Sequence, residues 1–141
     1  MIRVKIEDPQ GKNIVSAEQE ITFDEQGEAV GELILNISKP HLWNGRKDPF
    51  LYKTITELLR KGQITDRVEE KIGIRYFRVD PDKGFFLNDE PLQLRGACRH
   101  QDRAEIGNAL FPSHHREDME IMKEMGVNAV RLAHYPQDRY V

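Results

Sequence analysis

The chain has 141 residues, about the size of one ordinary domain, and its apolar fraction of 38% is enough for a hydrophobic core. Its 21 basic and 24 acidic residues are spread along the sequence with a net charge of -3, so no basic surface for a nucleic acid is expected. No apolar run approaches the roughly 20 residues of a membrane-spanning helix, and the opening segment lacks the apolar core of a signal peptide. These features disfavour nucleic-acid and membrane binding and predict a soluble chain, cytoplasmic or periplasmic.

The first 79 residues alternate between short extended segments and turn sequences, a pattern typical of an all-β sandwich. Segment 14–23 is expected to form a hairpin with 30–37, in which Gly31 marks a bulge, a close backbone approach or a position with no special role. Segment 51–60 fits both helical and strand periodicity, and its β-branched residues favour a strand. The expected strands are residues 2–6, 14–23, 30–37, 51–60 and 68–79, the last interrupted by Gly73.

A different pattern begins after residue 84. Residues 85–96 predict a tight hairpin that runs into a strand, a polar loop follows to about residue 112, and a helix of about three turns precedes strand 127–132. The helix signals are Ser113 as N-cap, Glu117 and Asp118 in the first turn, and Gly126 at the C-terminus. The order strand, helix, strand predicts a parallel βαβ unit. Such a unit normally belongs to a larger parallel sheet or barrel, so this part of the fold looks incomplete.

Three sequence blocks resemble the opening of the catalytic domain of glycoside hydrolase family 2. They are residues 84–96 (GFFLNDEPLQLRG), 99–102 (RHQD) and 126–136 (GVNAVRLAHYP). The upstream blocks are similar to the immunoglobulin-like domain that precedes the barrel in this family, at residues 40–43 (PHLW), 49–52 (PFLY) and 73–75 (GIR). The resemblance implies an immunoglobulin-like β-sandwich over residues 1–79 and, over residues 80–141, the truncated βαβ start of a (β/α)8 TIM barrel.

Within the family, residues 100–103 (HQDR) and 107–110 (GNAL) look most like β-galactosidases. The resemblance therefore implies part of a retaining, exo-acting β-galactosidase that hydrolyses terminal β-D-galactosyl residues. The alternatives are another family 2 glycosidase, namely a β-glucuronidase or a β-mannosidase, or a non-catalytic sandwich module that binds carbohydrate or protein. A β-galactoside is the expected partner of the longer protein, for which a divalent cation and homo-oligomer formation stay open. No cofactor and no metal ligands are expected within this chain.

Candidate substrate-binding residues are His100, Arg131 and His134. The active site of a (β/α)8 barrel lies at the carboxyl ends of its strands, and His100 follows the first strand while Arg131 and His134 end the second. Imidazole and guanidinium groups suit sugar hydroxyls, and the resemblance implies that the three line the subsite of the non-reducing sugar. For Arg131 two alternatives stay open, an interior ion pair or contact with a catalytic carboxylate from a later strand.

Retaining glycoside hydrolysis needs two carboxyl groups about 5–5.5 Å apart. The acids near the expected site, Asp102, Glu105 and Asp118, lie in a loop or at an exposed helix start, where solvated charge is expected. The resemblance implies that both catalytic glutamates come from later barrel strands beyond Val141. Residues 1–141 are therefore expected to contain no catalytic residue and to be inactive alone.

Other conspicuous residues favour structural interpretations. Cys98 stands where much of the family carries an asparagine, and a small packing residue is expected there in preference to a reactive thiol. The adjacent His114 and His115 are expected to be solvated, because neighbours in a helix do not share a face for metal binding. Trp43 is expected to pack in the sandwich or between domains in preference to stacking on a sugar. Nucleotide binding is disfavoured, because the turn after the barrel strand offers one glycine only, Gly96.

Overall fold

In the computed structural model, which describes residues 1–141, the chain divides into two units, Met1–Tyr76 and Phe77–Val141. The fold is mainly β, with nine strands and a single helix. Strand β5 (Phe77–Asp80) pairs with β6 (Gly84–Leu87), so residues 77–79, which were expected in the first domain, lie in the second unit. The helix has neither the length nor the apolar character that a membrane span requires.

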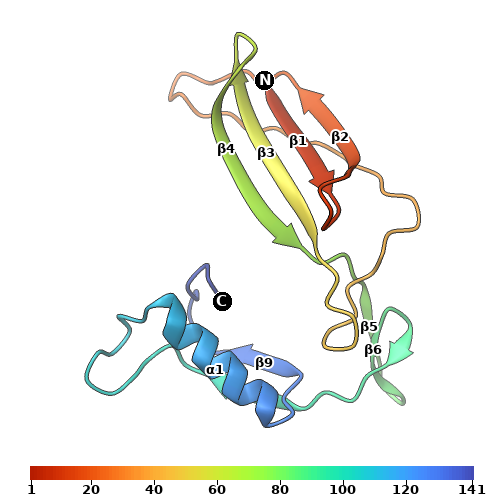
Figure 1. The fold of residues 1–141 in the computed structure, drawn as a ribbon, viewed down its shortest axis with the longest axis vertical. Helices are drawn as coiled ribbons and strands as arrows, with labels where there is room; N and C mark the ends of the chain where they lie inside the picture. The colour runs from red at the N-terminus through yellow and green to blue at the C-terminus, as the bar shows by residue number, and fades with distance from the viewer. The chain divides into compact units, whose positions relative to one another are not determined.

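The first unit is built on an antiparallel sheet of order β2-β1-β3-β4 (Figure 1). Its strands are β1 (Ile2–Glu7), β2 (Asn13–Gln19), β3 (Tyr52–Arg60) and β4 (Gln63–Ile72). The strand expected at 51–60 is therefore confirmed by β3. The hairpin expected between 14–23 and 30–37 is wrong, because β2 pairs with β1 and residues 28–37 form no strand.

A turn stabilised by a side chain connects β1 to β2. The carboxylate of Asp8 accepts hydrogen bonds from the backbone N–H groups of Gln10 and Lys12, each at 2.9 Å. Such a side-chain-stabilised turn reverses the chain and returns β2 along β1. Segment 28–37 instead passes close to β1, since a Cβ on Gly31 would lie 3.6 Å from Cγ2 of Ile2. A Cβ on Gly31 would also lie 3.1 Å from Cγ2 of Ile21 and 3.2 Å from Oε1 of Gln19, so the side chains of neighbouring segments approach the backbone closely at Gly31.

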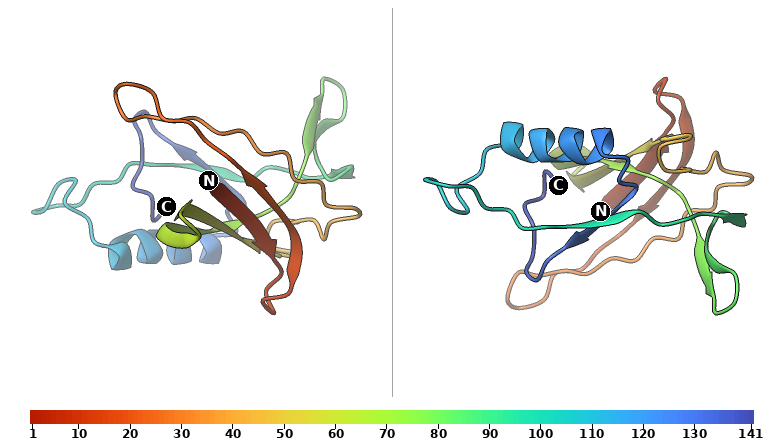
Figure 2. Two further views of the ribbon diagram at one scale, coloured as in Figure 1. Left: turned by 90° about the horizontal axis from the view of Figure 1, so that it is seen from above. Right: turned by 90° about the horizontal axis from the view of Figure 1, so that it is seen from below.

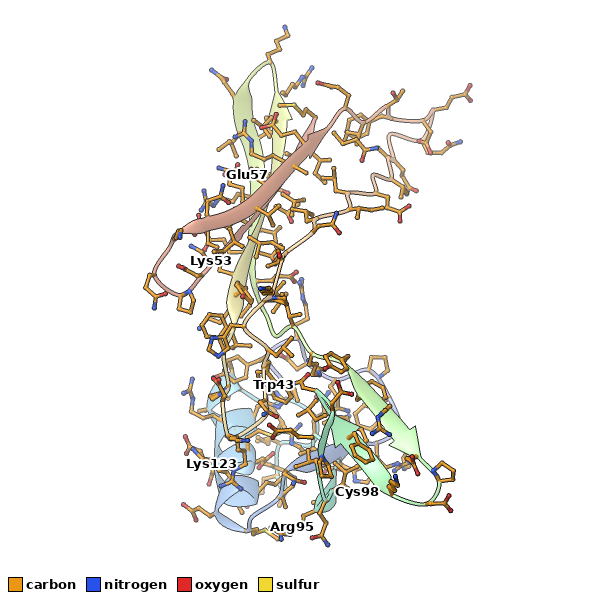
Figure 3. All side chains as sticks on the ribbon, turned by 90° about the vertical axis from the view of Figure 1, so that its right-hand side faces the viewer. Trp43, Lys53, Glu57, Arg95, Cys98 and Lys123 are labelled. Atoms are coloured by element: carbon orange, nitrogen blue, oxygen red, sulfur yellow. The ribbon has the colours of Figure 1, made fainter.

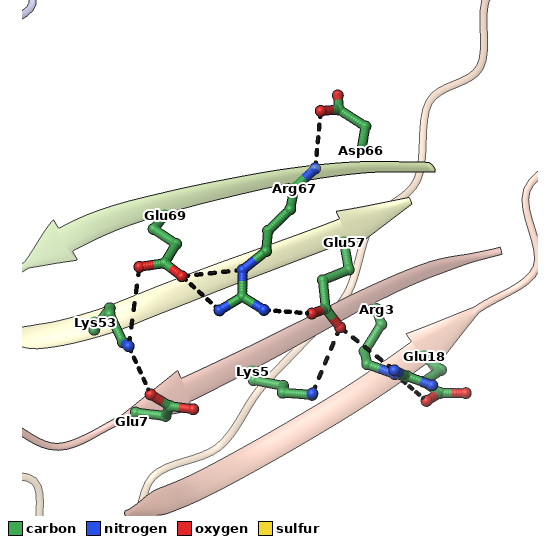
Figure 4. Close-up of polar contacts among 9 residues, drawn as sticks. All are labelled: Arg3, Lys5, Glu7, Glu18, Lys53, Glu57, Asp66, Arg67 and Glu69. Atoms are coloured by element: carbon green, nitrogen blue, oxygen red, sulfur yellow. Dashed lines mark hydrogen bonds and ion pairs between the residues drawn. The ribbon is translucent and has the colours of Figure 1, made fainter. Parts of the chain in front are cut away.

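One face of the sheet carries charged side chains from all four strands (Figure 4). The register places Arg3 opposite Glu57 and Glu57 opposite Arg67. Glu57 is 1% exposed, and its carboxylate lies 3.4 Å from Arg3 Nη1, 3.5 Å from Lys5 Nζ and 3.1 Å from Arg67 Nη1. These three cations compensate a buried charge that would be costly alone. Arg67 also donates to Glu69, and this bond lowers the pKa of the Glu69 carboxyl.

Trp43, labelled in Figure 3, packs on the chain just after β4. Its backbone N–H donates to the carbonyl of Ile74 at 2.9 Å, and the guanidinium of Arg75 lies 5.0 Å from its ring centroid. A Cβ at Gly73 would lie 2.9 Å from both Cβ and Cγ of Trp43, closer than real Cβ contacts come. The close approach of these two chain segments therefore requires glycine at position 73.

The second unit holds a small antiparallel sheet and a parallel strand pair. Strand β7 (Glu90–Pro91) joins β5 and β6 in the antiparallel sheet. Strands β8 (Gly96–Arg99) and β9 (Ala129–Leu132) pair in parallel, and α1 (Pro112–Glu124) connects them. Figure 2 shows the helix along one side of the pair. The expected βαβ unit is confirmed.

The start of α1 differs from the expected one. Phe111 is the N-cap and Pro112 the first helical residue, so Ser113 lies inside the first turn. Proline is well suited to this position because its missing N–H would have no helical partner there. No acidic residue lies in the first turn, so the placement of Glu117 and Asp118 there is also wrong. The end agrees with expectation, because Gly126 follows the C-cap Met125 with φ of 84°.

Candidate functional site

The parallel pairing of β8 and β9 decides which side chains share a face. Cys98 pairs with Arg131, and Arg99 pairs with Leu132. Because side chains alternate along a strand, Cys98 and Arg131 lie on one face of the pair and Arg99 on the other. Arg99 contacts α1, so Cys98 and Arg131 lie on the face away from the helix.

The three expected substrate-binding residues come together at the carboxyl ends of these strands. The rings of His100 and His134 lie 5.6 Å apart between centroids in an edge-to-face arrangement with an interplanar angle of 63°. Arg131 Nη2 lies 3.1 Å from His134 Nδ1. A guanidinium can only donate, so Nδ1 accepts and the proton of a neutral His134 ring sits on Nε2. All three side chains are exposed, and imidazole and guanidinium groups are thus available to a polar ligand.

Cys98 is exposed, so its expected role as a packing residue is wrong. It lies on the same face of the strand pair as Arg131. The side chain is labelled in Figure 3. Cys98 therefore borders the candidate site.

Arg99 and Asp118 form an ionic cluster on the helix side of the strands. Arg99 is 3% exposed, and its Nε and Nη2 donate to Asp118 Oδ2 at 3.0 and 2.8 Å. Arg103 Nη2 reaches the other carboxylate oxygen, Oδ1, at 3.1 Å. Burial raises the pKa of Asp118, but the hydrogen bonds from the two arginines outweigh it and hold the pKa below its ordinary value. The expectation that Asp118 is a solvated charge is wrong.

His115 was expected to be solvated and is instead 3% exposed. Its Nδ1 lies 2.8 Å from Arg99 Nη2, which again requires the ring to accept. The expectation failed because adjacent helical residues point in different directions, and position 115 is the one that points towards β8. His114 is half-buried, and its Nδ1 accepts the N–H of Phe111 at 3.2 Å.

The site holds imidazole and guanidinium groups and no carboxyl group suited to acid–base work. Asp102 and Glu105 are exposed in the loop after β8, and Asp118 is held ionised by two arginines. In residues 1–141 no three His, Cys, Asp or Glu side chains converge as metal ligands. The arrangement can therefore bind and orient a hydroxyl-rich ligand on one side.

Two family models match this chain. The model of glycosyl hydrolases family 2 matches residues 1–75, and the model of the TIM barrel domain of that family matches residues 78–141. The chain belongs to glycosyl hydrolase family 2. The expected fold is thereby confirmed, an immunoglobulin-like β-sandwich domain followed by the start of the TIM barrel.

Individual relatives agree with the family and differ in substrate. A β-glucuronidase of Bacteroides fragilis is 51% identical over 130 residues, which cover 92% of this chain and 19% of that protein. A β-galactosidase of Bacteroides ovatus is 30% identical over 131 residues, 93% of this chain and 15% of that protein. The crystal structure of Bacteroides uniformis β-glucuronidase matches with a TM-score of 0.85 and 38% identity, over 99% of this chain and 17% of that one. The chain thus spans less than a fifth of the length of these relatives.

The three candidate residues chosen from the sequence come together in the structure, whereas the ionic cluster of Arg99, Arg103 and Asp118 was not expected. A signal was present, since Arg99 and Arg103 bracket the segment that contains His100. Neither periodicity nor spacing indicated that both arginines would reach Asp118, which lies 15 residues after the second one.

Proposed function

We propose that residues 1–141 belong to a retaining, exo-acting β-glycosidase and build one side of its sugar subsite. His100, His134 and Arg131 contact the hydroxyls of the terminal sugar, while both catalytic glutamates come from barrel strands outside this chain. The observation that carries the proposal is the convergence of the three side chains at the carboxyl ends of β8 and β9, where barrel enzymes bind substrate.

For the substrate we infer a β-glucuronide, with a β-galactoside as the second candidate. The β-glucuronidase of Bacteroides fragilis, at 51% identity, supports the first choice over the β-galactoside expected from the sequence. The β-galactosidase of Bacteroides ovatus, at 30% identity, supports the second. A longer polypeptide that contains this chain, assayed with nitrophenyl β-glucuronide, β-galactoside and β-mannoside, should give its highest kcat/KM with the glucuronide. A higher value for the galactoside would restore the original expectation.

The role of the site is tested with single substitutions in the same longer polypeptide. His100→Ala and His134→Ala should each lower kcat/KM by about tenfold or more, because a buried sugar hydroxyl then loses its hydrogen-bond partner. Glu105→Gln, an exposed change in the same loop, is the matched control. Unchanged kcat/KM in both histidine variants would refute the proposed site.

A substitution of Arg131 tests which group its guanidinium binds. A guanidinium that binds the carboxylate of a uronic acid favours glucuronides alone, whereas one that binds sugar hydroxyls, as proposed above, or a catalytic carboxylate acts on both substrates. Arg131→Ala is therefore assayed on the glucuronide and the galactoside in parallel. We expect equal losses on both, because the proposed contacts of Arg131, beside His134, are with hydroxyls that both sugars carry. A loss confined to the glucuronide would assign Arg131 to the substrate carboxylate.

The 141-residue chain by itself should release no nitrophenol from any of these glycosides. It supplies one side of the subsite and no pair of free carboxyl groups. Hydrolysis by the purified chain at a rate above that of a His100→Ala variant would contradict this part of the proposal.

A further inference from the structure

Two arginines bind the two oxygens of one carboxylate at the edge of the candidate site. Arg99 ends β8 and donates twice to Oδ2 of Asp118, and Arg103, four residues later, donates to Oδ1. Asp118 therefore contacts both ends of the segment 100–102, and Glu117 of the same helix also binds Arg103, at 2.7 Å from Nη2. Bonds between a guanidinium and a carboxylate are among the strongest and most directional in proteins.

The segment between the two arginines has few other supports of its own. His100 and Asp102 are exposed, so apolar packing does not hold them in place. Gln101 ties the segment to the loop after β9, because its N–H donates to Tyr135 Oη at 3.0 Å and its Oε1 accepts the N–H of Asp138 at 3.0 Å. The backbone groups of Arg103 and Gly107 then close the rest of the loop through a mutual pair of hydrogen bonds.

We propose that Asp118 is a positioning residue of this site, which acts through Arg99 and Arg103 to hold His100 against His134. Asp118 does not touch the ligand. It binds the residues at the start and the end of the three-residue segment. The hydrogen bonds of Gln101 then connect this segment to the loop that contains His134. The consequence for sugar binding rests on the proposed function, whereas the geometric effect does not.

The arrangement suits a positioning role better than a purely stabilising one. Asp118 lies in α1, and of its two partners Arg99 is buried at the end of β8, whereas Arg103 lies in the loop. The strand pair has separate supports, since Asn128 donates its N–H to Arg95 and accepts the N–H of Arg95 in return. Loss of the Asp118 bonds should therefore loosen the loop and leave the β8–β9 pair in place.

The test uses the full 141-residue chain and two NMR readouts. The first is the amide exchange rate of Gln101, whose N–H is bonded to Tyr135, together with the contact between the His100 and His134 rings. The second is the amide exchange rate of Asn128, which reports the strand pair. Asp118→Asn should raise the exchange rate of Gln101 about tenfold, the change expected when charge-assisted hydrogen bonds are lost, and abolish the ring contact. Asn128 should exchange within about twofold of the unaltered chain.

Glu120→Gln is the matched control, because Glu120 is an exposed acid of the same helix. It should leave Gln101 exchange within about twofold. If Asp118→Asn loses the signals of the strand pair as well, Arg103→Gln replaces it, since that variant keeps the buried Arg99 pair and should still raise Gln101 exchange. An unchanged ring contact in a folded Asp118→Asn chain, or equal rises at Gln101 and Asn128, would overturn the proposal.

The outcome is separable from that of the proposed function. Loss of the ring contact in Asp118→Asn supports the positioning role even if the chain binds no sugar. If the longer polypeptide is an active glycosidase, Asp118→Asn should lower kcat/KM, as His100→Ala does. The double variant should have a kcat/KM little below that of His100→Ala alone, because both changes remove the same interaction. Additive losses would show that Asp118 acts independently of His100 and would refute the coupling.

Discussion

Replacing Gly73 with alanine should destabilise the first unit, because the added methyl group has no room against Trp43. The new Cβ would lie 2.9 Å from Cβ and Cγ of Trp43 and 3.2 Å from Cδ1. A rotation of the indole ring cannot relieve the contact with Cβ, so the backbone must move. The Trp43 N–H to Ile74 carbonyl bond, 2.9 Å long, opposes that movement.

Forced overpacking of this kind costs about 1–3 kcal/mol of unfolding free energy. For a unit of this size a loss of 2 kcal/mol lowers the melting temperature by about 8–16 °C. Trp43 is the only tryptophan, so urea unfolding followed by its fluorescence reports the first unit directly. Gly96→Ala is the control, because its Cβ would meet nothing closer than a backbone oxygen at 3.6 Å. A Gly73→Ala midpoint equal to that of the unaltered chain, with unchanged Trp43 emission, would refute the reasoning.

Three further predictions concern the core, the ionic cluster and the thiol. Ile55 is 2% exposed, and its replacement by alanine should lower the unfolding free energy of the first unit by about 2–4 kcal/mol, measured by urea denaturation. The pKa of Asp118 is lowered by Arg99 and Arg103, so its ionised form stabilises the second unit above the ordinary carboxyl pKa of 3.8, and that stabilisation is lost as pH falls below it. In thermal melts of the unaltered chain between pH 6 and about pH 3, the melting temperature should therefore fall more steeply with pH at the acid end. In Asp118→Asn the melting temperature should depend less on pH in that range. Cys98, the only thiol and exposed, should react with iodoacetamide in the folded chain, and protection until urea unfolds it would contradict the exposure.

Local patterns in the sequence were enough to predict most of the second unit. The helix, its terminating Gly126 and the parallel pair of strands follow from periodicity, from a glycine that tolerates positive φ and from the length of the crossover. The start of the helix was misjudged by two residues, because serine, a strong N-cap candidate, competed with Pro112, which is favoured at the first helical position.

Strand pairing in the first unit was harder to predict from the sequence. Alternating residues at 30–37 indicated a strand, and the turn at Asp24 indicated a hairpin with 14–23. The chain instead pairs β2 with β1 through the turn at Asp8, although the carboxylate of Asp24 accepts an equivalent pair of backbone hydrogen bonds from Gln26 and Glu28. Alternation reports which residues can face a core and does not name the partner strand.

The sequence by itself determined the strand, helix, strand order of the second unit and the residue types at the candidate site. His100, Arg131 and His134 could be chosen because strand ends in a βαβ unit fall at one edge, a consequence of local geometry. Tertiary structure alone decided what holds them. Asp118 binds two arginines from another segment, and His115 is buried against Arg99 while its neighbour His114 is not. The physical reason is that a charged side chain is expected to be solvated when the sequence shows no nearby partner. Only the folded chain brings a partner from another segment within hydrogen-bonding distance.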